Sequence, residues 1–113
     1  MTPAELAGHA AEAVRALNHA TLPGPAGAYE VTGQLAVLAA RLPQALAQLL
    51  AFLQDQDAAG RMQVVAGQHA GDPAAMLTAA TADLDAAVAS ARRLHQPLDG
   101  AQNHLTWAAG TES

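Results

Sequence analysis

Residues 29–57 read YEVTGQLAVLAARLPQALAQLLAFLQDQD, and this stretch decides the fold. Its leucines recur at spacings of three and four, at Leu35, Leu38, Leu42, Leu46, Leu49 and Leu53. At about 3.6 residues per turn, this spacing places them along one face of an α-helix. The sequence therefore predicts a long amphipathic helix that buries its leucine row.

Pro43 lies in the middle of this stretch. A proline inside a helix removes the hydrogen bond to the carbonyl four positions earlier, here that of Ala39, and costs about 3 kcal/mol in isolation. The leucine row nevertheless keeps its phase across Pro43, and no loop-forming residues flank it. One long, kinked helix is therefore favoured over two shorter helices, which remain the alternative.

The residues that precede this helix predict a second, shorter helix over 3–19. Thr2 is suited to cap its first amides, with Pro3 at the first helical position and Glu5 three residues after the cap. One apolar face follows at helical spacing, formed by Leu6, Ala10, Ala13, Val14 and Leu17. The segment is therefore an ordinary amphipathic helix.

The segment after it begins in the same way, with Asp72 as cap and Pro73 at the first helical position of a helix over 73–95. Its expected apolar face is Leu77, Leu84, Val88 and Ala91. Pro97 follows, but apolar residues continue beyond it at spacings of three and four. We therefore expect either a kinked continuation of this helix or a fourth short helix over 97–109.

Glycine-rich and proline-rich stretches at 20–28 and 58–72 predict the loops between these helices. With 31 alanines and few β-branched residues, local preference favours helix over nearly the whole chain. The expected fold class is all-α. We expect a single domain over 1–113, a bundle of three to four antiparallel helices in which the two long, proline-kinked helices form a hairpin.

Charge and composition exclude several functions. The net charge is -5, lysine is absent and the five arginines form no basic stripe, so nucleic acid is not an expected ligand. Cysteine is absent as well, which fits a reducing compartment, and no signal peptide opens the chain, so we expect a cytoplasmic protein. Residues 35–53 are apolar enough to suggest a membrane span, but Arg41 and the sidedness of Gln44 and Gln48 favour a soluble bundle.

A second apolar face made of alanine lies on each long helix. These two alanine rows comprise Ala79, Ala82, Ala86 and Ala89 in one helix and Ala36, Ala40, Ala47 and Ala51 in the other. Alanine is a favourable residue at any helix surface, which is one interpretation. The other is that small side chains let a second helix approach closely, which predicts an interface with a second copy of the chain or with another helical protein.

No catalytic or cofactor motif is present, so we expect no enzyme, no cofactor and no metal. The weak metal candidates are Glu5, His9 and Glu12, which share one helix face. No Glu-x-x-His pair recurs on another helix as di-metal bundles require, and the alternative is a solvated polar face.

The pattern YEVTGQLAVLAARLPQALAQLLAFL, followed by GDPAAM and ADLDAAVASARRLHQPLDGAQNHL, resembles small alanine-rich helical proteins of high-GC Gram-positive bacteria that have no known function. Some of those proteins are encoded near mobile-element genes, and the resemblance implies an accessory role. In size and lack of cysteine the chain is also similar to the dimeric secreted helical hairpins with a Trp-x-Gly turn. Here Trp107 is followed by Ala108 and Ala109, which departs from that turn.

The expected function is a non-enzymatic helical interaction or scaffold protein that self-associates as a homodimer. Two alternatives remain open. One is a helical bundle that binds a metal or a small ligand, and the other is a secreted hairpin similar to the Trp-x-Gly family.

Overall fold

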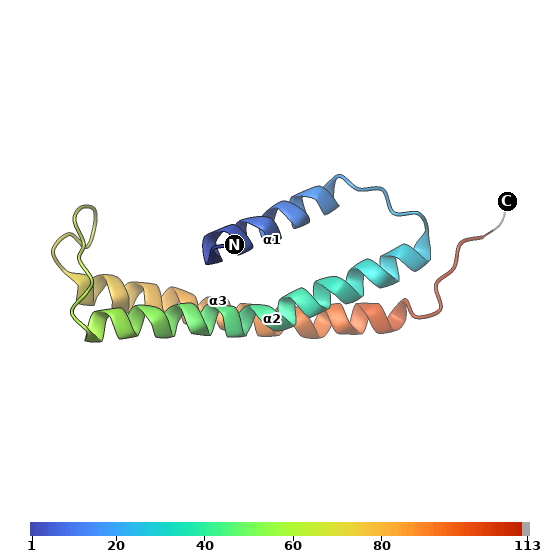
Figure 1. Ribbon diagram of the computed structural model, residues 1–113. Coiled ribbons are helices and arrows are strands. Elements are labelled where there is room, and N and C mark those ends of the chain that lie inside the picture. Colours follow the sequence, from blue (N-terminus) through green and yellow to red (C-terminus); the bar gives the residue numbers. More distant parts are fainter. Residues whose placement is uncertain (112–113) are drawn as a thin grey trace.

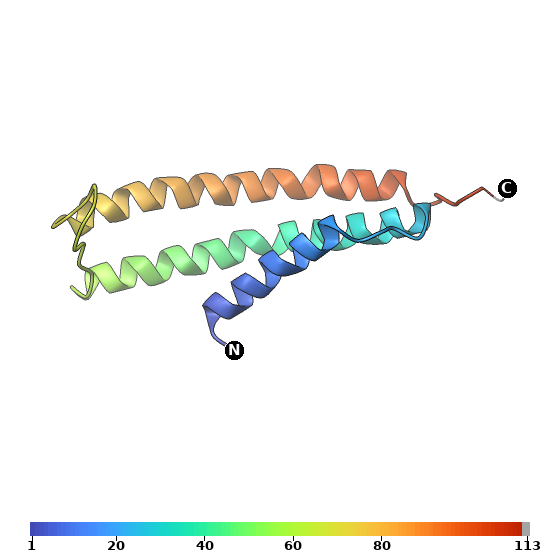
Figure 2. The ribbon, with the colours of Figure 1, turned by 90° about the horizontal axis from the view of Figure 1, so that it is seen from above.

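The computed structural model describes residues 1–111, which form three helices: α1 (Pro3–Asn18), α2 (Pro25–Ala58) and α3 (Pro73–His104). The two long helices lie side by side as an antiparallel hairpin, and α1 folds back along the first half of α2 (Figures 1 and 2). No strand occurs in this range, and the all-α prediction is confirmed. Close packing between helices within residues 1–111 is confined to α2 and α3.

Local chemistry sets where two of the helices begin. The Thr2 hydroxyl accepts a hydrogen bond from the amide of Glu5 at 3.1 Å, and the Asp72 carboxylate accepts one from the amide of Ala75 at 3.0 Å. Both caps were predicted. In contrast, α2 begins at Pro25 instead of near Tyr29, because a proline needs no amide hydrogen bond at the first helical position.

We expect Asp72→Ala to lower the free energy of unfolding by about 1 kcal/mol, because the capped amide at the start of α3 loses its side-chain partner. Urea denaturation followed by circular dichroism measures this change. Asp83→Ala is the matched control, since Asp83 is an exposed carboxylate within the same helix. Equal losses in the two variants would contradict a capping role for Asp72.

Both long helices run without a break through their internal prolines. Pro43 lies inside α2 and Pro97 inside α3, so neither a division of α2 nor a separate helix over 97–109 is observed. Figure 1 shows α2 changing direction near its middle, the region that contains Pro43. Each proline therefore lies within a continuous helix, and neither proline ends the helix that contains it.

The interior of the hairpin is made of small residues. The buried apolar residues of the described chain are Ala36, Ala39 and Ala91, with exposed fractions of 4%, 1% and 7%. Near the open end of the hairpin a Cβ atom added at Gly33 would overlap the amide end of the Gln102 side chain, so that side chain lies directly against the backbone of α2. Small residues at such contacts let neighbouring helices pack closely.

This packing divides the leucine row of α2, which was predicted to be buried as a whole. Leu35, Leu46 and Leu53 are partly buried, whereas Leu38, Leu42 and Leu49 are exposed. The physical reason is that α3 packs on the neighbouring face, where Ala36, Ala39 and Pro43 allow a closer approach than a row of leucines does. On α3 the predicted face is the covered one, formed by Leu77, Leu84, Val88 and Ala91.

Candidate functional site: an apolar ridge on α2

An exposed row of apolar side chains runs along the middle of α2. We name it the ridge, and it comprises Leu38, Leu42, Ala45, Leu49 and Phe52. The spacings of four, three, four and three residues place these side chains on one face of the helix. Leu49 is 47% exposed and Phe52 is 57% exposed. The ridge therefore presents large apolar side chains that the hairpin itself leaves uncovered.

The surroundings of the ridge carry almost no charge. Arg41 is the one charged residue between Val31 and Gln54. A helix that faces only water usually carries charged residues on its outer side, and contiguous exposed apolar surface marks interaction sites. The composition of α2 therefore provides apolar packing surface on more than one side of the helix.

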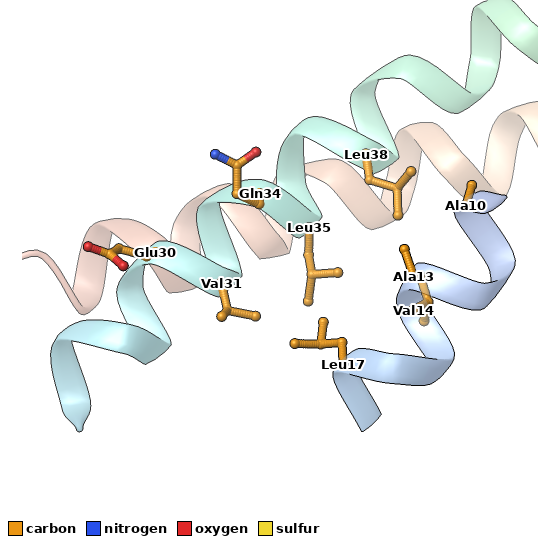
Figure 3. Close-up of a pocket in the computed structure, with 9 residues that line it drawn as sticks. All are labelled: Ala10, Ala13, Val14, Leu17, Glu30, Val31, Gln34, Leu35 and Leu38. Carbon is orange, nitrogen blue, oxygen red and sulfur yellow. The ribbon is translucent and has the colours of Figure 1, made fainter. Parts of the chain in front are cut away.

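The helix α1 lies over the first part of the same face of α2, without packing closely on it. Between the two helices lies an open groove of about 470 Å³. In Figure 3 the side chains of Leu17 and Leu35 point into it from opposite walls, while the polar ends of Glu30 and Gln34 point away from α1. The full lining is Ala10, Ala13, Val14, Leu17, Glu30, Val31, Gln34, Leu35 and Leu38. The groove is therefore apolar, and it runs into the ridge at Leu38.

The groove opens toward the start of α1. Figure 2 shows the N-terminal end of α1 diverging from α2. Leu6 belongs to the apolar face of α1 but is 56% exposed, and Val14 is exposed as well. The apolar surfaces of α1 and α2 thus face each other without closing on each other.

The alanine rows that were predicted as an interface lie elsewhere. On α3 all four members, Ala79, Ala82, Ala86 and Ala89, are exposed on the side away from α2. On α2 the members Ala40, Ala47 and Ala51 are exposed, on the side of the helix opposite the ridge. Ala36 departs from the prediction, because it is buried in the hairpin and is not accessible to a second chain.

The metal candidates Glu5, His9 and Glu12 are exposed on α1. Glu12 pairs with Arg15 at 3.3 Å, and Glu5 accepts a hydrogen bond from the Thr2 hydroxyl at 3.2 Å. Within residues 1–111 no group of three or more histidines and carboxylates gathers at metal-binding distance. That part of the chain also contains no buried polar side chain, so the groove offers apolar contact and no oriented chemical group.

By length and composition α2 is also able to cross a membrane. A single helix of this kind is weak evidence, because the core helices of other proteins pass the same test. Only a small share of the most apolar stretch of α2 is buried in the structure. Most of the apolar surface of α2 is therefore exposed.

Comparisons of the chain with protein-family models, with curated proteins and with solved structures find no match.

Proposed function

We propose that this chain is a non-enzymatic helical interaction protein whose working unit is a homodimer. The observation that carries the proposal is its surface: one copy exposes 8310 Å². A compact folded chain of 11.4 kDa exposes about 5,800 Å², so the excess is about 2,500 Å².

The shape and the interior support the same proposal. The radius of gyration is 19.2 Å, against about 13 Å for a compact domain of this length. Among the described residues three alanines are buried, and no large apolar side chain is fully buried. Apolar burial is the main favourable term in folding, so a single copy has little to hold its helices together.

A second copy is a fitting occupant of this surface. A standard interface covers about 800 Å² on each partner, and permanent homodimers cover more. The excess surface of one copy is large enough for either class. Two hairpins that meet through α2 form a four-helix core, with one α1 flanking each side.

The proposal is tested by the concentration dependence of stability. We expect Tm to rise by several degrees between 5 and 500 µM protein, because a hundredfold increase in concentration favours the dimer by about 2.7 kcal/mol. Circular dichroism melts give Tm, and sedimentation equilibrium gives the molar mass in the same buffer. A chain that sediments as a monomer at 500 µM, with a constant Tm, contradicts the proposal.

A further inference from the structure

We propose that the second copy docks its own α2 across the ridge in antiparallel orientation, with the twofold axis at Ala45. This inference rests on the proposed function, and it names the face and the geometry of the interface. The outer faces of the alanine rows are the competing location.

The order of residues along the ridge fits a twofold axis. Counted from Ala45, the other members lie at -7, -3, +4 and +7. An antiparallel copy therefore brings Leu42 against the partner's Leu49 and Leu38 against the partner's Phe52, and each contact occurs twice. A twofold interface requires this kind of self-complementary surface. The small side chain at the centre lets the two helix axes approach closely.

Charge favours the antiparallel orientation over the parallel one. Arg41 lies beside the ridge and is the one charge in this part of α2. A parallel pair in register would place the two Arg41 side chains next to each other. In the antiparallel pair the two positions are eight residues apart along the axis, or about 12 Å, and Arg41 lies opposite the uncharged partner segment near Gln48 and Leu49.

The position of α1 sets the length of the contact. Because α1 lies over the α2 surface from Val31 to Leu35, the part of this face left for an incoming helix is the ridge. From Leu38 to Phe52 this is a length of about 21 Å. The two α2 helices therefore cross at their centres instead of running together along their full length. The diverging end of α1, with Leu6 exposed, forms a side wall for the incoming helix (Figure 2).

Disulfide trapping tests this geometry, because the chain has no cysteine of its own. Two cysteines join when their Cα atoms lie about 4.4–6.8 Å apart, a distance that only residues at the twofold axis reach with their own copies. We expect Ala45→Cys to form a disulfide-linked dimer in more than half of the protein under mild oxidation, as read on a non-reducing gel. Ala47→Cys, on the opposite side of α2, is the matched control and should stay monomeric on the gel. Circular dichroism verifies that both variants are helical.

The other possible results separate the docking geometry from the proposed function. If Ala86→Cys links efficiently and Ala45→Cys does not, the dimer uses the alanine row of α3, and the inference is overturned while the proposed function stands. A wild-type dimer in sedimentation with no linkage at Ala45 overturns the inference as well. If the wild type sediments as a monomer, both proposals fail. In that case, flotation of the chain with phosphatidylglycerol vesicles would assign the ridge to a lipid surface.

Discussion

Leu49→Glu is expected to raise the dimer Kd by about 10- to 100-fold. Fully burying a leucine side chain contributes about 1.5–3 kcal/mol, and Leu49 is 47% exposed in one copy, so about half of this is gained at the interface. The substitution removes two such side chains from a twofold interface, a loss of about 1.4–2.8 kcal/mol, which is a factor of about 10 to 100 in Kd. It also places a carboxylate in an apolar contact, where the partner's Arg41 is the one charge opposite it. Sedimentation equilibrium over a range of concentrations measures the effect.

Gln44→Glu is the matched control for this substitution. It adds the same charge to the same helix at an exposed position outside the ridge. We expect the Kd of this variant to stay within about threefold of the wild-type value, since isolated surface charges have small effects. Equal weakening by both substitutions would show that charge on α2, and not contact at the ridge, controls association.

Ala39→Leu is expected to destabilise the hairpin by about 1–3 kcal/mol and to lower Tm by about 5 °C or more. Ala39 is the most buried residue of the described chain, 1% exposed, and it lies on the face of α2 that packs on α3. The added atoms force the helices apart, because a close-packed contact between small residues has no space for them. Thermal melts at one fixed concentration measure the change.

The neighbouring Ala40 provides the control. It is exposed on the same turn, so Ala40→Leu should change the free energy of unfolding by no more than about 0.5 kcal/mol. If both leucine variants are equally stable, the helices do not depend on small residues at their contact.

The helix starts at Thr2 and Asp72 were predictable because they depend on residues within one turn. A threonine or aspartate before a proline satisfies the first amides of a helix whatever the rest of the chain does. The persistence of α2 through Pro43 was predictable for a related reason. The apolar residues keep one phase on both sides of the proline, so a continuous helix buries more of them than a broken one.

The face of α2 that packs on α3 was harder to predict. Two apolar rows lie side by side along the middle of this helix. Each residue of one row is followed directly in the sequence by a residue of the other row. The row that faces α3 is Ala36, Ala39, Pro43, Leu46, Leu50 and Leu53, and the ridge follows one position earlier from Leu38 to Phe52. Each row contains three leucines, so leucine content does not separate them, and the predicted leucine row took members from both. The choice depends on which pair of surfaces lets the axes come closest, and this is a property of both helices together.

The width of this apolar surface was nevertheless visible in the sequence. Leu50 and Phe52 extend the leucine row to either side, so the apolar arc is wider than one neighbouring helix covers. The width of this arc predicts that α3 alone leaves part of the apolar surface of α2 exposed, as the structure shows at the ridge. The groove beside α1 was not predictable, because the angle of α1 depends on the connection between Asn18 and Pro25.

With the proposed dimer as the working unit, the three buried alanines would also tie the lifetime of the protein to its abundance. A copy that meets no partner keeps an interior too small to resist opening, and proteases degrade proteins through their open forms. Newly made chains below the Kd would therefore be removed, while those above it persist as dimers. The cellular level of such a protein responds steeply to its rate of synthesis, so that gene dosage acts as a threshold.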